Sequence, residues 1–192
     1  MKNKTIIGLF IISFLVLGIF GFVKAQTEQQ TQIESTNQVQ IDSFFDIFIE
    51  IDGIPGESTD DKHKDWIEVL SYSHGMDMST GKVAHIDFNF VKRLDKSSPI
   101  INLAVNTGEH FKEATVQICS KGGEKLCYME YKMTDVYITS VHVGGSSSSE
   151  IPMEEISLNY GKIVWKFTPQ DEAGRPKPPI TTGWDLKLNK KV

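Results

Sequence analysis

The sequence predicts a mainly β domain of antiparallel strands with one short helix. Apolar residues alternate with polar ones in several short runs, which is the pattern of half-buried strands. Glycine, proline and other turn-forming residues separate these runs at fairly regular spacing, and one segment alone carries helix start and stop signals. Many short strands at such spacing are typical of a β-barrel or a β-sandwich. The composition, 40% hydrophobic and 23% charged, is ordinary for a folded protein.

The first 25 residues have the layout of a secretory signal peptide. Lys2 and Lys4 form a basic start, Ile6 to Val23 is an almost unbroken apolar run, and Val23-Lys24-Ala25 resembles a cleavage site. An uncleaved anchor is the alternative, because a run of about 18 apolar residues nearly spans a bilayer. We expect cleavage near Ala25, no stable membrane anchor afterwards, and export to the periplasm or the medium.

Residues 26–43 are predicted to be a flexible linker. The segment is rich in Gln and Thr and has isolated aliphatic residues without periodicity. Such a composition buries too little apolar surface to offset the entropy lost on ordering. The folded domain is therefore expected to span residues 44–192.

Three strands are predicted in the first part of the domain. Phe45 to Ile51 places Phe45, Ile47, Ile49 and Ile51 on one face, and the stretches Trp66 to Tyr72 and Val83 to Val91 also alternate. Ile86, Phe88 and Phe90 share a face in the last of these. The intervening segment His74 to Gly81 (HGMDMSTG) is expected to be a loop, because it is rich in turn-forming residues.

The one helix is predicted at the sequence SSPIINLAV. Ser97 or Ser98 precedes Pro99, which suits the first helical position, and Asn106 or Gly108 supplies a stop signal. The helix is short, so packing must stabilise it.

The second half is predicted to be β-rich as well. Two runs, 114–120 and 126–135, flank Lys121-Gly122-Gly123-Glu124, which indicates a β-hairpin. Further strands are expected at 136–143, 155–167 and 184–188, with a flexible loop at 144–149 and a proline-rich turn at 175–179.

Motifs of catalysis, metal binding and cofactor binding are missing from the sequence. It contains neither a Gly-Xaa-Ser-Xaa-Gly elbow nor a phosphate-binding Gly-Lys-Ser/Thr loop, and it lacks His-Glu-Xaa-Xaa-His and dinucleotide fingerprints. The five histidines are scattered without ligand spacing, so they are interpreted as surface or turn residues. The net charge of −5 argues against a nucleic-acid partner. We therefore expect no enzyme activity, metal or cofactor.

The two cysteines flank the predicted Gly-Gly turn. In a simple hairpin register Cys119 and Cys127 point to opposite faces and cannot bond. A one-residue bulge, which is frequent near glycine turns, places them opposite each other. An oxidising compartment favours pairing, so a Cys119–Cys127 disulfide is predicted, with free thiols as the alternative.

Four blocks resemble the haemolysin-coregulated protein (Hcp) family. They are DIFIEIDGIPGES with its continuation to Gly75, the KSSP sequence before the helix, the hairpin from Ala114 to Tyr128, and the closing GWDLKLNKK. The resemblance extends over about residues 45–192, nearly the whole predicted domain.

This resemblance implies a small β-barrel of two sheets with one flanking helix. It also implies a tube subunit of the type VI secretion system, without a catalytic site, that forms homohexameric rings. The rings stack into a tube that carries a spike and can hold effector cargo. A signal peptide departs from the family pattern, so the alternative is an exported monomeric binding or adhesin-like module on the same fold.

Two segments are predicted to mediate ring stacking, namely Ser73 to Lys82 and Val143 to Pro152. Each lies between predicted strands, is polar or rich in Gly and Ser, and lacks a core-forming pattern. The alternative is that both are ordinary variable surface loops. The candidate residues are His74, Met76, Asp77, Met78, Gly144, Gly145 and Ser146.

Overall fold

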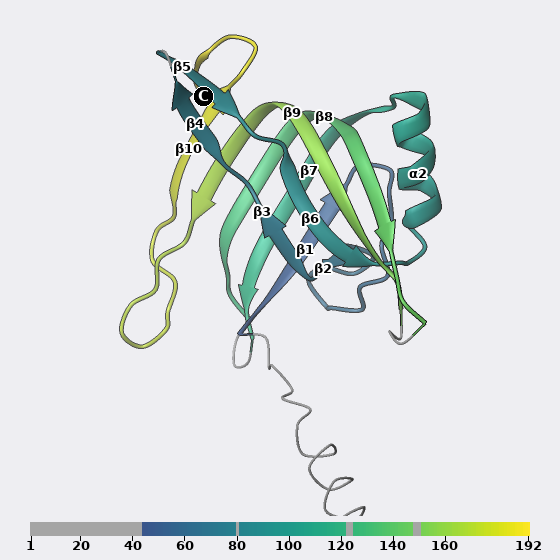
Figure 1. Ribbon diagram of the computed structural model, residues 1–192. Coiled ribbons are helices and arrows are strands. Elements are labelled where there is room, and N and C mark those ends of the chain that lie inside the picture. The colour runs from purple at the N-terminus through teal and green to yellow at the C-terminus, as the bar shows by residue number, and fades with distance from the viewer. Residues whose placement is uncertain (1–43, 80, 122–124, 148–150) are drawn as a thin grey trace, which may run out of the picture. The chain divides into compact units, whose positions relative to one another are not determined.

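The described chain is a strongly curved β-sheet with one helix beside it (Figure 1). The computed structural model describes residues 44–79, 81–121, 125–147 and 151–192. The predicted signal peptide and the predicted linker at 26–43 lie outside the described residues. Among the described residues, no helix has both the length and the hydrophobicity needed to cross a membrane.

Two sheets account for all strands of the described part. In the larger one, the strands follow the order β11-β10-β9-β8-β7-β1-β2, while β6 pairs with β9 and β3 pairs with β6. The smaller sheet is the hairpin β4-β5. The elements are β1 (Phe45–Ile51), β2 (Ile67–Val69), β3 (Ser71–Ser73), β4 (Met76–Ser79), β5 (Lys82–His85), β6 (Phe88–Arg93), α2 (Ser98–Thr107), β7 (His110–Ser120), β8 (Cys127–Gly144), β9 (Met153–Phe167), β10 (Ile180–Asp185) and β11 (Lys190–Lys191).

The large sheet curls back on itself at Leu70. Just before this residue β2 pairs with β1, and just after it β3 pairs with β6. The Leu70 amide donates to the Val91 carbonyl at 2.8 Å, so the chain changes partner without a gap. The predicted strand 66–72 is therefore divided in two, and the barrel is not closed by one continuous ladder.

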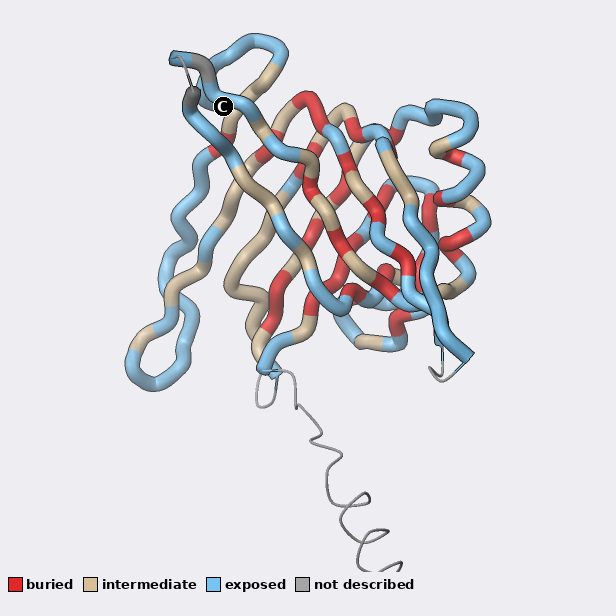
Figure 2. Tube along the Cα trace, viewed as in Figure 1, coloured by how far each residue is buried: buried red, intermediate tan, exposed pale blue. Residues whose placement is uncertain are grey.

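The core lies on the inner face of the curved sheet, where buried positions alternate along the strands (Figure 2). Of the predicted stripe in β1, Ile47, Ile49 and Ile51 are buried, whereas Phe45 at the strand end is exposed. This alternation confirms the mainly β class and removes most of the inward-facing apolar side chains from water. The fully buried apolar residues include Ile67, Phe88, Ile101, Met133, Ile156, Leu158 and Ile163.

The helix α2 covers one end of the sheet and confirms the predicted helix. Pro99 lies in its first turn, and Gly108 ends it in the left-handed conformation at φ +65°. Ile101 and Ala104 are buried on its inner side. The hydroxyl of Ser97, the residue before the helix, donates to Asp95 and makes no cap to the helix backbone.

Several predicted boundaries were wrong. The run 83–91 is broken after His85, and Ile86 is exposed instead of sharing a buried face with Phe88. The two predicted strands 126–135 and 136–143 are one strand, β8, because the ladder with β9 continues past Asp135 despite its φ of +57°. The last predicted strand begins earlier, at Ile180, and ends at Asp185.

Candidate functional site: the projecting hairpin and the opposite turn

The predicted stacking segment 73–82 is a β-hairpin, not a loop. Met76 pairs with His85 and Met78 pairs with Val83, and Gly81 at φ +78° allows the tight return of the chain. The alternation of Met76 and Met78 was the available signal, but Asp77 between them and the Gly and Ser residues on either side favoured a loop. The hairpin projects from the sheet beside β10 (Figure 1).

One face of this hairpin is apolar and exposed. Met76 and Met78 point the same way because they are two positions apart on one strand. Val83 shares their face because it is the cross-strand partner of Met78. Met78 is 78% exposed, and Met76 and Val83 are each exposed by more than two fifths. Asp77 and Ala84 lie on the opposite face. Such a stripe on a projecting element suits contact with another protein surface.

Two histidines and a tyrosine form the base of the hairpin. The Tyr160 hydroxyl lies 2.6 Å from Nε2 of His74 and 3.1 Å from Nδ1 of His85. Burial, aided by the nearby His85, lowers the pKa of His74, and burial lowers the pKa of His85 as well. Burial also raises the pKa of Tyr160, to which Asp87 contributes. The hairpin is thus anchored on β9 through contacts of both histidine rings with the Tyr160 hydroxyl.

The second predicted segment joins β8 to β9. Gly144 is the last residue of β8, and Gly145 and Ser146 follow it. A Cβ on Gly145 would lie 2.9 Å from the Cβ of Pro152, so this close approach requires glycine. The rim of the turn carries three exposed apolar side chains, Val143, Ile151 and Met153.

The two candidate groups lie at opposite ends of the domain (Figure 1). His74, Met76, Asp77 and Met78 belong to the hairpin end, and Gly144, Gly145 and Ser146 belong to the β8–β9 turn. The structure therefore does not bring them together in one subunit. Opposite placement fits a head-to-tail contact, in which the hairpin of one copy meets the turn of the next.

Among the described residues, one strand edge is left unpaired. β10 pairs with β9 on one side, but β11 pairs only with Trp184 and Asp185 on the other. Ile180, Thr181 and Thr182 are exposed along the remaining edge. Unpaired strand edges of this kind are surfaces on which a second chain can add.

A second cluster lies on the outer face of β1, β7 and β8, under the segment 54–66. The His63 ring stacks on Phe48 at 4.1 Å, and Trp66 meets it edge-on at 4.9 Å. Below the ring the register of β7 and β8 shifts at Ile118/Cys119, so Cys119 pairs with Cys127. A disulfide joins these two residues. The bulge is thus the feature that places both sulfur atoms on the same face.

Charged groups hold this cluster in place. Nδ1 of His63 lies 2.6 Å from Asp60, and Lys125 lies 2.6 Å from the other oxygen of the same carboxylate. The hydrogen bond from Lys125 holds the pKa of Asp60 well below its usual range. Sequence analysis missed the cluster, because His63 and the cysteines are more than 50 residues apart and no spacing rule connects them.

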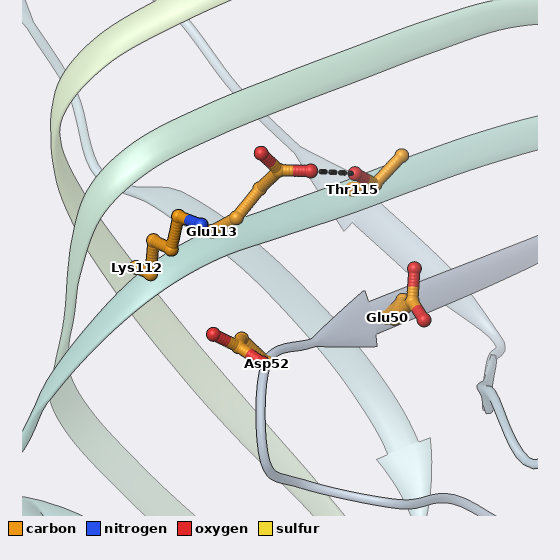
Figure 3. A pocket seen from close by; sticks show the side chains of 5 residues that line it. All are labelled: Glu50, Asp52, Lys112, Glu113 and Thr115. Carbon is orange, nitrogen blue, oxygen red and sulfur yellow. Dashed lines mark hydrogen bonds between the residues drawn. The ribbon is translucent and has the colours of Figure 1, made fainter.

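A shallow surface pocket lies where β1 ends beside β7 (Figure 3). Glu113 accepts a hydrogen bond of 3.5 Å from Thr115 and pairs with Lys132 at 2.7 Å. Because the lining is mainly carboxylates at an open surface, it is a solvated acidic patch. The lining residues are Glu50, Asp52, Lys112, Glu113 and Thr115.

These features define a class. A curved β scaffold with an apolar projecting hairpin, an apolar-rimmed turn at the opposite end and an open strand edge belongs among proteins that act through assembly surfaces.

The comparisons with known proteins identify the family. Residues 48–167 match the family model described as type VI secretion system effector, Hcp. Protein hcp1 of Pseudomonas aeruginosa strain PAO1 is 33% identical over 156 residues, which cover 75% of this chain and 96% of that protein. The chain therefore belongs to the Hcp family, whose members are tube subunits of the type VI secretion system.

Solved structures agree with this assignment. The structure of a type six secretion system protein matches with a TM-score of 0.72 at 34% identity, covering 77% of this chain and 99% of that one. Hcp1 from Salmonella typhimurium matches with a TM-score of 0.67 at 33% identity, covering 78% and 100%. A type VI secretion system effector from Yersinia pestis gives 0.65 at 33% identity, covering 73% and 99%.

Proposed function

We propose that this chain is a structural, non-enzymatic Hcp subunit that forms homohexameric rings and that these rings stack head to tail through the hairpin β4-β5 and the β8–β9 turn. The observation that carries the stacking proposal is the placement of two exposed apolar surfaces at opposite ends of one domain (Figure 1). Head-to-tail contacts repeat without limit along an axis, which is the geometry that a tube requires.

Ring formation uses a different surface. The open edge of β10 at Ile180 to Thr182 offers backbone groups and an exposed isoleucine to a neighbouring subunit. A closed ring covers such edges in every copy and leaves none to template aggregation. Lateral and axial contacts are therefore separable by mutation.

The stacking proposal is tested with two matched substitutions. Met78→Asp places a carboxylate in the apolar stripe, whereas Ala84→Asp places the same group on the opposite face of the same hairpin. Both sites are exposed, so neither change should impair folding. We expect stacked rings for the wild type and Ala84→Asp, but single rings for Met78→Asp. Sedimentation velocity and electron microscopy provide the measurement.

Two outcomes would refute parts of this proposal. Stacks of Met78→Asp as long as those of the wild type would remove the hairpin from the stacking contact. Wild-type protein that remains monomeric at high concentration would exclude the ring, and the exported monomeric binding or adhesin-like module would take its place.

Export through the leader, followed by assembly in the periplasm or the medium, is part of the proposal. It rests on the basic start, the apolar run and the sequence Val23-Lys24-Ala25. Mass spectrometry of the exported protein should find Gln26 or a neighbour as the first residue, and an intact Met1 in the membrane fraction would contradict it. A secretion spike and effector cargo are the further partners proposed for the assembled tube.

A further inference from the structure

Three metal-ligating side chains converge on the outer face of the sheet. Nε2 of His63 lies 3.8 Å from Sγ of Cys119 and 3.7 Å from Sγ of Cys127. His63 and Cys119 are buried, and Cys127 is partly exposed. One side chain comes from the segment 54–66 and two come from neighbouring strands, so the fold holds all three donors in place.

The distances suit a tetrahedral metal ion. Zinc bonds of about 2.3 Å to sulfur and about 2.0 Å to nitrogen separate a nitrogen and a sulfur ligand by about 3.5 Å, and two sulfur ligands by about 3.8 Å. The two nitrogen–sulfur distances observed here are already close to this value. Only the two sulfur atoms, now bonded to each other, must move apart when the disulfide is reduced.

The surroundings of His63 are those of a metal ligand. Asp60 accepts a hydrogen bond from Nδ1 at 2.6 Å, which leaves Nε2 as the nitrogen that faces the sulfur atoms. A carboxylate on the far nitrogen commonly orients a zinc-bound histidine and raises its basicity. Lys125 fixes Asp60, and Phe48 fixes the plane of the ring.

An oxygen ligand is also at hand. Oε1 of Gln117 lies 2.8 Å from Nε2 of His63, and its orientation is set because the Gln117 amide nitrogen donates to Glu130 at 2.7 Å. Zinc accepts oxygen as well as nitrogen and sulfur ligands. The fourth position of a tetrahedron is thus available to this amide oxygen or to water.

We propose that the reduced chain binds one zinc ion through Nε2 of His63 and the thiolates of Cys119 and Cys127, and that the zinc-bound and disulfide forms exclude each other. A dithiol reductant transfers two electrons and two protons to the disulfide, becomes a disulfide itself, and leaves two thiols. Zinc then displaces the proton of each thiol and binds Nε2 of His63, and any proton held on that nitrogen is released to solvent. Oxidation of the two thiolates by a disulfide oxidant reverses the process and releases the ion.

The two forms suit the two sides of an exporting membrane. Thiols persist in the reducing cytoplasm, whereas disulfides form outside it. In the disulfide form, Cys119 and Cys127 link β7 to β8 directly. In the zinc form the ion links the same two cysteines and also connects them to His63 in the segment 54–66. The partly exposed Cys127 provides the route by which a metal or a reductant enters.

The test titrates the protein, reduced under anaerobic conditions, with Zn²⁺ alone in competition with a chromophoric chelator. We expect one ion per chain for the reduced protein and none for the oxidised protein. His63→Gln should weaken zinc binding at least tenfold, and Asp60→Asn about 10–100-fold as an outer-shell change. His110→Gln is the matched control, because His110 also pairs with an aspartate but lies outside the cluster, and it should bind as the wild type does.

Spectroscopy with Co²⁺ distinguishes the loss of a metal ligand from the loss of the fold. Sulfur-to-cobalt charge-transfer bands should accompany a tetrahedral visible spectrum in the reduced wild type, and Cys127→Ser should lose part of the charge-transfer intensity while circular dichroism stays unchanged. The proposal is overturned if the reduced protein does not compete with the chelator, if the oxidised protein binds equally well, or if His63→Gln binds with wild-type affinity. None of these outcomes depends on ring assembly.

Discussion

Lys92 and Glu154 are paired directly across β6 and β9, and their charged groups lie 2.7 Å apart with no exposed surface on either side chain. The Lys92 ammonium also contacts Asp95 at 2.7 Å and the Ser98 hydroxyl at 3.1 Å. Ser98 in turn donates to Glu154 at 2.7 Å. The pair thus joins two strands to the first turn of α2.

Removal of one partner of this pair should be strongly destabilising. Lys92→Met leaves the Glu154 carboxylate buried without its cation, and we expect a loss of about 3–5 kcal/mol in the free energy of unfolding. The double variant Lys92→Met/Glu154→Leu should lose less, because it leaves no uncompensated buried charge. Urea denaturation of both variants measures the difference. A double variant less stable than Lys92→Met would contradict this expectation, because it would show that Glu154 stabilises the fold without Lys92, through its hydrogen bond with Ser98.

The histidine pair at the base of the hairpin predicts sensitivity to acid. The pKa values of His74 and His85 are lowered in the folded protein, so the unfolded chain binds more protons once the pH falls below about 6.5. Stability should therefore decline as the pH falls through this value. The titratable groups that face these rings are each other, the Tyr160 hydroxyl and, beside His74, Tyr131, with Asp87 close to Tyr160.

Denaturation midpoints between about pH 7.5 and about pH 5 test this sign. The double variant His74→Phe/His85→Phe should lose part of the acid-induced decline, whereas His142→Gln, a change at an exposed site, should keep it. An equal decline in all three proteins would assign the effect to other groups.

Much of the fold followed from local signals. The stripe of β1 and the Pro99 and Gly108 signals of α2 are visible in the sequence because each depends on residues close together in the chain. The division of strand 66–72 at Leu70 was not predictable in this way, since it arises from a change of partner between β1 and β6. The continuation of β8 past Asp135 likewise depends on its partner β9.

The functional features were harder to predict from the sequence. The candidate stacking residues were predicted because both segments lack a core-forming pattern. The hairpin geometry of the first segment was not predicted, since it depends on pairing between Met76–Ser79 and Lys82–His85. Lys92 reads as a surface residue in the sequence, although it continues the buried stripe of Phe88 and Phe90. The burial of Lys92 is explained by its ion pair with Glu154, which is more than 60 residues away in the chain.

The segment over the His63 cluster depends on one glycine. A Cβ on Gly56 would lie 2.2 Å from the Trp66 carbonyl oxygen and 2.4 Å from the Ile67 nitrogen, so backbone atoms would have to shift. Gly56→Ala should therefore destabilise the domain by about 1–3 kcal/mol, as overpacking does. Gly144→Ala, where no atom lies within 4 Å of the added Cβ, is the control and should be nearly neutral. Thermal unfolding compares the two, and a neutral Gly56→Ala would show that segment 54–66 is free to move.

The disulfide should stabilise the exported protein. Cys119 and Cys127 are separated by 8 positions in the chain, and closure of so short a loop reduces the entropy of the unfolded state. We expect the Cys119→Ser/Cys127→Ser variant to lose about 2 kcal/mol in the free energy of unfolding. Denaturant titrations of this variant and of the wild type, both in metal-free buffer without reductant, measure the loss. Non-reducing peptide mapping of the exported protein is the accompanying control, because alkylation of both cysteines without prior reduction would show that the thiols are free and that the bulge does not lead to a covalent bond.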